Sequence, residues 1–181
     1  MIDSWDILSH HDEADYRIFS VRRTRMRAPH TGLEHDFYVI DAPAWINVVP
    51  VTADGQLVLI RQYRPGTDAV TLEIPGGMVD EGETPEAAAR RELREETGYA
   101  AEDWTDLGAV SPNPALQSNR CHTFLAENAR EDGAPELDVG EDIETTLIDP
   151  AKIPALITEE KITHALVVAA FYLYEQHQRD P

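Results

Sequence analysis

Short runs of β-forming residues follow one another along the first part of the chain. Partial alternation of apolar and polar residues, with many Val, Ile, Tyr and Phe, is typical of strands. The pattern predicts strands at Tyr16–Arg27, Phe37–Asp41, Ala44–Thr52, Gln56–Arg64 and Val70–Ile74. Asp54-Gly55 joins the third and fourth of these segments, and this dipeptide predicts a tight hairpin turn.

The sequence period changes at Thr84, which is a good N-cap residue and is followed by Pro85, a natural first helical residue. The next residues are mainly Ala, Glu, Arg and Leu, which favour helices. Gly98 stands where a C-cap glycine is expected. The pattern therefore predicts a helix over Pro85–Thr97.

The rest of the chain mixes both kinds of element. It predicts strands at Leu107–Ser111, Cys121–Glu127 and Ile143–Ile148, an acidic loop at Asn128–Asp142 and an amphipathic helix at Ile162–Gln176. Several strands with separated helices predict an α+β fold, with a mixed β-sheet in an α/β/α sandwich. We expect residues 1–43 to form an N-terminal antiparallel strand extension and residues 44–181 to form the main domain.

Composition and charge narrow the function classes. The chain has 34 Asp and Glu against 15 Lys and Arg, a formal net charge of −19, which argues against nucleic-acid binding. Its one cysteine, Cys121, cannot form an intrachain disulfide, and the N-terminus lacks the pattern of a signal peptide. The longest apolar stretch, Ala165–Tyr174, is too short to span a membrane. We therefore expect a soluble cytoplasmic protein.

Three carboxylates share one face of the predicted helix. Glu92, Glu95 and Glu96 stand at positions i, i+3 and i+4, so their like charges repel one another. Such a cluster becomes favourable when a hard divalent cation such as Mg²⁺ binds between the oxygens. Two glycines before the helix let the backbone approach a metal or phosphate closely. The combination indicates phosphoryl chemistry.

The spacing of these residues resembles the box of the Nudix hydrolase family, Gly-x5-Glu-x7-Arg-Glu-U-x-Glu-Glu-x-Gly-U with U apolar. The chain matches every fixed position, with Gly77, Glu83, Arg91, Glu92, Leu93, Glu95, Glu96, Gly98 and Tyr99. The resemblance implies a mixed sheet between helices and hydrolysis of a diphosphate linkage.

The resemblance also implies roles for the box residues. Glu92, Glu95 and Glu96, with the carbonyl of Gly76, would hold Mg²⁺ or Mn²⁺, with two or more ions per site. Glu95 would belong to the catalytic group as well. Glu83 and Arg91 would support catalysis by holding the helix and the preceding loop together.

Segments before the box resemble the ADP-ribose pyrophosphatase branch of the family. They run from Arg61 to Pro65 and from Glu73 to Gly77. The resemblance implies that Arg61, Arg64, Glu73 and Arg120 bind the substrate. Where this branch usually has Ser-Pro-Gly followed by a glutamate, the chain has Ser111-Pro112-Asn113-Pro114-Ala115. GDP-mannose and other nucleotide sugars therefore stay open as substrates beside ADP-ribose.

A late loop would supply the general base in this branch. Glu141 is the preferred candidate, with Asp138, Asp142 and Glu144 as alternatives. The branch also commonly forms homodimers through N-terminal strands. An aromatic residue such as Phe19, Phe37 or Trp45 could then stack on the base.

The residues and the resemblance together predict a metal-dependent pyrophosphohydrolase. It would cleave ADP-ribose or another nucleoside diphosphate sugar into a nucleoside monophosphate and a sugar phosphate. Dinucleoside polyphosphates or a capped RNA end are alternative substrates, although the negative charge disfavours RNA. A non-catalytic nucleotide-sugar sensor is a further alternative, disfavoured because the box keeps every glutamate.

Overall fold

The computed structural model describes residues 2–179 and divides the chain into two compact units. The first unit contains the residues up to Pro43 together with Ser111–Arg120. The second contains Ala44–Val110 and the residues from Cys121 onward. Ser111–Arg120 therefore groups with the N-terminal strands, although it lies between two strands of the second unit in the sequence.

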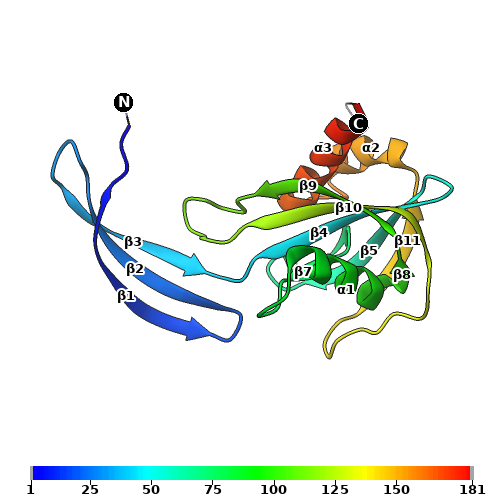
Figure 1. Cartoon of the computed structure of the whole chain (residues 1–181), viewed down its shortest axis with the longest axis horizontal. Helices are drawn as coiled ribbons and strands as arrows, with labels where there is room; N and C mark the ends of the chain where they lie inside the picture. The colour runs from blue at the N-terminus through cyan, green and yellow to red at the C-terminus, as the bar shows by residue number, and fades with distance from the viewer. Residues whose placement is uncertain (1, 180–181) are drawn as a thin grey trace. The chain divides into compact units, whose positions relative to one another are not determined.

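The first unit is built on a three-stranded antiparallel sheet in the order β1-β2-β3 (Figure 1). Its strands are β1 (Asp6–Tyr16), β2 (Phe19–Arg27) and β3 (Glu34–Asp41). The prediction of one strand over Tyr16–Arg27 was wrong at its start, because Tyr16 ends β1 and Arg17 turns the chain with a φ of 26°. The sequence prediction missed β1 altogether. Almost all of its residues are exposed, so it lacks the alternation of a half-buried strand.

Segment Ser111–Arg120 runs along β3. The amide of Ile40 donates to the carbonyl of Leu116 at 2.8 Å, and the amide of Ser118 donates back to the carbonyl of Ile40 at 3.1 Å. The hydroxyl of Ser118 donates to Asp41 at 2.7 Å, and Arg22 forms an ion pair with the same carboxylate. Backbone and side-chain bonds thus hold this segment to the N-terminal sheet.

The second unit contains an eight-stranded mixed sheet whose central order is β11-β5-β4-β10-β8. The β4 and β10 strands are parallel, and the other pairs are antiparallel. The strands are β4 (Trp45–Thr52), β5 (Leu57–Arg64), β6 (Ala69–Glu73), β7 (Gly76–Met78), β8 (Tyr99–Ala100), β9 (Asp103–Val110), β10 (Cys121–Glu131) and β11 (Ile143–Ile148). The predicted hairpin at Asp54-Gly55 is confirmed, and it joins β4 to β5.

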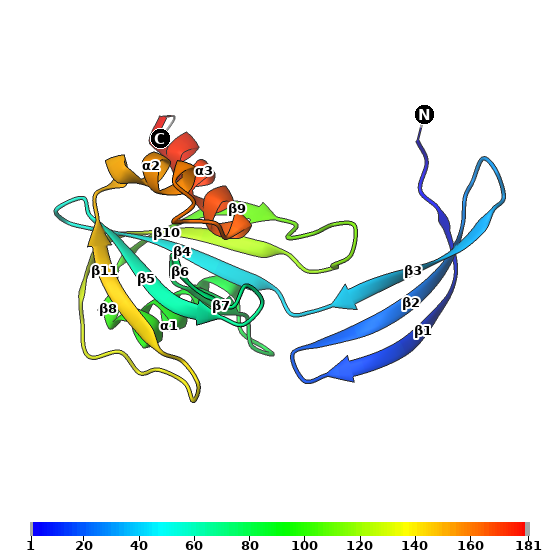
Figure 2. The same ribbon diagram turned by 180° about the vertical axis from the view of Figure 1, so that it is seen from behind.

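Helices cover both faces of this sheet, as Figures 1 and 2 show. The helix α1 (Pro85–Thr97) packs on one face, and α2 (Ile153–Thr158) and α3 (Ala165–Arg179) lie on the other. Alternate residues of β4 serve the two cores, because Val48 packs with α1 and Val49 packs with α3. The predicted α+β fold with a mixed sheet between helices is confirmed.

The box helix α1 begins and ends where the sequence predicts. The Thr84 side chain accepts a hydrogen bond from the amide of Ala87, and Pro85 occupies the first turn. Gly98 ends the helix with a φ of 72°, a left-handed conformation that glycine adopts at little cost. Strong local signals therefore fix the helix that carries the candidate metal ligands.

Two expectations for later elements were wrong, and one helix was missed. The sequence predicts a loop at Asn128–Asp142, but the first residues of this segment belong to β10, which continues to Glu131. The strand pairing has an irregularity between Glu127 and Ala129. Asn128 takes a positive φ of 54° at this bulge, and Ala129 returns to the core. The terminal helix begins at Ala165 rather than Ile162, and α2 was not predicted.

Within residues 2–179, no helix combines the length and the apolar character that crossing a membrane would require.

Leu93 anchors α1 on the sheet, since its side chain is fully buried among Ile46, Val48 and Phe124. We expect Leu93→Ala to lower the free energy of unfolding by about 2–5 kcal/mol, because it leaves a cavity in this core. Leu147→Ala, at a half-exposed position of β11, is the control and should cost much less. Urea denaturation checks both, and equal losses would contradict this role for Leu93.

Candidate active site

Arg91 is the centre of a hydrogen-bond network on α1. Its guanidinium donates to Glu92 at 2.9 Å, to Glu95 at 3.0 Å and to both oxygens of Glu83. It also donates to the carbonyl of Met78 at 3.0 Å. Hydrogen bonds and charge from these carboxylates, Glu83 foremost, hold the pKa of Arg91 above its usual value. One cation therefore joins the carboxylate helix to the loop before it.

The close approach of β7 to α1 explains why residue 77 is a glycine. A β-carbon built on Gly77 would lie 2.1 Å from a carboxylate oxygen of Glu92, far inside van der Waals contact. Any side chain at this position would displace the glutamate. The glycine thus lets the backbone of the loop lie directly against a candidate metal ligand.

Glu96 is the most buried of the three candidate metal ligands. Its side chain accepts a hydrogen bond from the amide of Gly76 at 2.9 Å, and burial raises its pKa to about 8. Burial also raises the pKa of Glu92. Both shifts arise mainly because burial removes the carboxylates from water, and the nearby positive charge does not compensate for this loss.

The chemistry of this donor set fits a hard divalent cation. Glu92, Glu95 and Glu96 offer oxygen ligands, and a bound cation would supply the charge that the buried glutamates lack. In residues 2–179, however, no three His, Cys, Asp or Glu side chains already converge as a ligand set. Arg91 binds two of the three glutamates, so metal binding would require these side chains to rearrange.

Glu141 lies on the loop before β11, close enough for its charge to act on the candidate ligands. After burial, its negative charge contributes to the raised pKa of both Glu92 and Glu96. Its carboxylate accepts a hydrogen bond from the amide of Asp138 at 2.9 Å, which closes a turn at the tip of the loop. This influence on both glutamates supports Glu141 as the preferred candidate for the base, with Asp138, Asp142 and Glu144 as the alternatives.

A second network surrounds Glu73, whose side chain is only 2% exposed. Arg64 donates to its two oxygens at 2.9 and 2.7 Å, Thr71 donates at 2.6 Å, and His164 lies 3.0 Å away. Burial alone would raise the pKa of Glu73, but the bonds from Arg64, His164 and Thr71 hold it well below its usual range. Glu73 is therefore an ionised group inside the protein.

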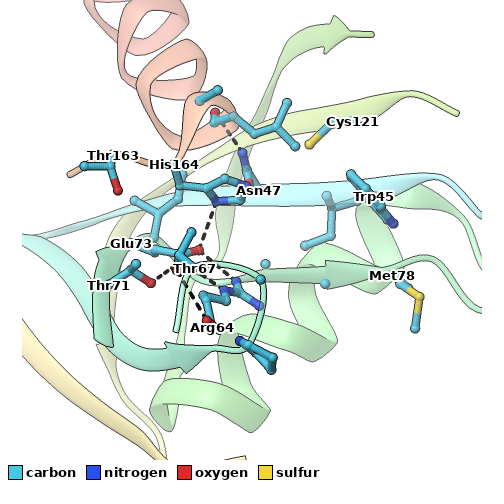
Figure 3. A pocket seen from close by; sticks show the side chains of 18 residues that line it. Trp45, Asn47, Arg64, Thr67, Thr71, Glu73, Met78, Cys121, Thr163 and His164 are labelled. Atoms are coloured by element: carbon cyan, nitrogen blue, oxygen red, sulfur yellow. Dashed lines mark hydrogen bonds and ion pairs between the residues drawn. The ribbon is translucent and has the colours of Figure 1, made fainter. Parts of the chain in front are cut away.

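A cavity of about 490 Å³ lies beside this network and reaches the glycines of β7. Its polar end contains Arg64, Glu73 and His164 (Figure 3). Its other end is apolar and includes Trp45 and Met78, which are direct partners across β4 and β7. The cavity can therefore receive a ligand with one polar and one flat apolar part.

The structure brings together some of the predicted substrate-binding residues and not others. Arg64 and Glu73 line the cavity, and so does Trp45, one of the candidate stacking aromatics. Arg61 is exposed on β5 and does not line it. Arg120 belongs to the first unit, as do Phe19 and Phe37. His164 is a cavity residue that the sequence prediction missed.

Comparison with known proteins decides the family. Residues 42–171 match the NUDIX domain. The chain belongs to the Nudix family. The match extends far beyond the box on both sides, and it confirms the membership that the spacing of residues 77–99 predicted.

Three proteins illustrate what the chain is similar to. The chain is 35% identical over 119 residues to the ADP-ribose pyrophosphatase of Bacillus subtilis (strain 168), an alignment that spans 64% of each chain, just under two thirds of the relative. It is 29% identical over 140 residues, 76% of each chain, to the methanol dehydrogenase activator of Bacillus methanolicus. A crystal structure of an ADP compounds hydrolase matches with a TM-score of 0.87 and 26% identity, covering 99% of this chain and 96% of that one.

The charge of Glu73 leads to a pH-dependent prediction for this Nudix chain. Its folded pKa lies below the unfolded value of 4.5, so its contribution to stability is present above that pH and is lost as the pH falls. We expect Glu73→Gln to lower the free energy of unfolding by about 2–3 kcal/mol at pH 7. The difference from wild type should shrink as the pH falls below about 4.5.

Chemical denaturation of both proteins across this pH range checks the prediction. Glu102→Gln is the control, because Glu102 forms only an exposed ion pair with Arg130 and should matter little. A loss of stability for Glu73→Gln that stays constant down to pH 3 would contradict a charge-based role.

Proposed function

We propose that this chain is a metal-dependent pyrophosphohydrolase that cleaves ADP-ribose or a related nucleoside diphosphate sugar. The observation that carries the proposal is the Arg91 network, which holds the complete box against the loop at one end of the cavity. The similarity to an ADP-ribose pyrophosphatase and to an ADP compounds hydrolase supports the same reaction class.

The products would be a nucleoside monophosphate and a sugar phosphate. Water attacks one phosphorus of the diphosphate, and the bridging P–O bond breaks. Glu92, Glu95 and Glu96, with the Gly76 carbonyl, would hold Mg²⁺ or Mn²⁺, which neutralises phosphate charge and makes bound water more acidic. Glu141 accepts the proton of the attacking water, and its place within electrostatic range of Glu92 and Glu96 supports this role.

Arg64 supplies fixed positive charge at the polar end of the cavity. Glu73 orients its guanidinium through two hydrogen bonds, so little freedom is lost when an anionic ligand binds. Trp45 offers an aromatic surface at the apolar end. A nucleotide sugar, with phosphates, hydroxyl groups and a flat base, matches these features.

A substrate panel with a matched pair of variants tests the function. The panel contains ADP-ribose, ADP-glucose, GDP-mannose and a dinucleoside polyphosphate, each with Mg²⁺ or Mn²⁺, and chromatography resolves the products. We expect wild type to release AMP from ADP-ribose. Glu96→Gln should lower kcat at least about 100-fold, because it removes a buried candidate metal ligand.

Glu86→Gln is the control on the same helix. Glu86 pairs with Arg90 on the exposed side of α1, so its loss should leave kcat nearly unchanged. Turnover of GDP-mannose or the polyphosphate, but not of ADP-ribose, would show a different substrate. It would leave the proposed metal-dependent hydrolysis unchanged. No metal-dependent turnover of any compound would refute the enzymatic proposal and favour a nucleotide-sugar sensor.

We also propose that the chain forms a homodimer through its N-terminal sheet. Large apolar side chains are exposed there, including Ile7, Tyr16, Ile18 and Tyr38. Exposed apolar side chains like these are commonly buried in an interface. The cytoplasmic location expected from the sequence stays a prediction.

Sedimentation velocity tests the dimer. We expect twice the chain mass of 20.3 kDa for wild type, and a shift toward the monomer for the double variant Ile7→Glu/Tyr38→Glu. Leu147→Glu, an exposed apolar position in the second unit, is the control and should stay dimeric. A monomeric wild type at micromolar concentration would refute the proposal.

A further inference from the structure

The four hydrogen bonds around Glu73 use up its capacity to bind anything else. One oxygen accepts from Arg64 Nε and Thr71 Oγ1, and the other accepts from Arg64 Nη2 and lies 3.0 Å from His164 Nδ1. A carboxylate has about four lone-pair sites in total. Since Glu73 is also buried, a ligand in the cavity would meet Arg64 and His164 rather than Glu73 itself.

The carboxylate determines which nitrogen of His164 carries a proton. An ionised glutamate can only accept hydrogen bonds, so Nδ1 must be the protonated nitrogen of the ring. In the neutral imidazole, Nε2 is then a hydrogen-bond acceptor. Within residues 2–179, the structure gives Nε2 no partner, although His164 lines the cavity and its side chain is 38% exposed.

Arg64 provides the complementary group. Its Nε and Nη2 bind Glu73, while Nη1 has no partner among the described residues. Both side chains are held by the same carboxylate and line the same end of the cavity, as Figure 3 shows. A donor and an acceptor fixed side by side suit a group that both accepts and donates, which a sugar hydroxyl does and a phosphate ester does not.

We propose that His164 is a substrate-binding residue whose Nε2 accepts a hydrogen bond from a sugar hydroxyl of the nucleotide sugar. The inference rests on the proposed function, which supplies the class of ligand. It makes His164 the residue that discriminates this class. Glu73 is then a positioning residue that fixes the tautomer of His164 and the orientation of Arg64. His164 stands directly before α3 and accepts the hydrogen bond of the Val168 amide through its carbonyl, so the backbone holds it in place.

Two amide substitutions separate ligand binding from a purely structural role. In His164→Asn, the amide nitrogen can take the place of Nδ1 and keep the bond to Glu73, but nothing replaces Nε2. In His164→Gln, the longer side chain carries an amide to the place of Nε2 and gives up the bond at Nδ1. If His164 binds the ligand, His164→Asn should weaken ligand binding more than His164→Gln does. If the role of His164 is structural, His164→Gln should be the more damaging of the two.

Binding of AMP and of ribose 5-phosphate is measured by NMR titration in the presence of Mg²⁺. Neither compound contains a diphosphate, so the result does not depend on hydrolysis. We expect His164→Asn to raise the Kd of one of the two about five- to tenfold, the effect of one hydrogen bond. The compound whose Kd rises shows which sugar contacts His164. The melting temperature of His164→Asn should equal that of wild type.

The ring itself gives a second readout. Long-range ¹H–¹⁵N spectra, recorded where the His164 signals no longer change with pH, should show the Nδ1–H form, with the Nε2 signal shifting when the affected compound binds. Equal binding by His164→Asn and wild type, an Nε2–H ring, or no binding of either compound would each overturn the proposal. A protein that binds a sugar phosphate in this way but cleaves no nucleotide sugar would refute the proposed function alone.

Discussion

Repulsion between carboxylates on one helix face is the constraint on which the candidate site depends. Glu92, Glu95 and Glu96 lie within one turn of α1, and two of them are largely buried. Arg91 offsets part of this repulsion and at the same time binds Glu83 and the Met78 carbonyl. Because one guanidinium serves both purposes, the box helix and its preceding loop form one rigid element beside the cavity.

A buried carboxylate hydrogen-bonded to an arginine also occurs at Glu73, but its pKa shifts in the opposite direction. Burial, together with the negative charges of Glu92 and Glu141, raises the pKa of Glu96. Around Glu73, the hydrogen bonds from Arg64, His164 and Thr71 outweigh the effect of burial, and the pKa falls. The first region is thus prepared to gain a cation, and the second is already neutralised by protein groups. Under the proposed function, the first region would hold the metal and the second would hold the substrate.

The sequence predicted those features that depend on residues close together in the chain. The caps of α1, the Asp54-Gly55 hairpin and the Nudix box are all local, and the structure and the family match confirm them. The β1 strand escaped prediction because it is exposed on both faces and carries no period. His164 escaped because its contact with Glu73 joins positions 91 residues apart, and no local pattern marks such a pair.

The proposed reaction requires Glu92, Glu95 and Glu96 to bind a divalent cation, which would replace the bonds from Arg91 to Glu92 and Glu95. Addition of Mn²⁺ to the ¹⁵N-labelled protein tests it most directly, because the paramagnetic ion broadens the signals of nearby nuclei. We predict that the signals of Gly76, Glu92, Glu95 and Glu96 broaden at the lowest Mn²⁺ concentration. In a parallel titration with diamagnetic Mg²⁺, the side-chain signal of Arg91 should shift as its bonds to Glu92 and Glu95 break. Early broadening elsewhere, with the Arg91 signal unchanged, would contradict the account.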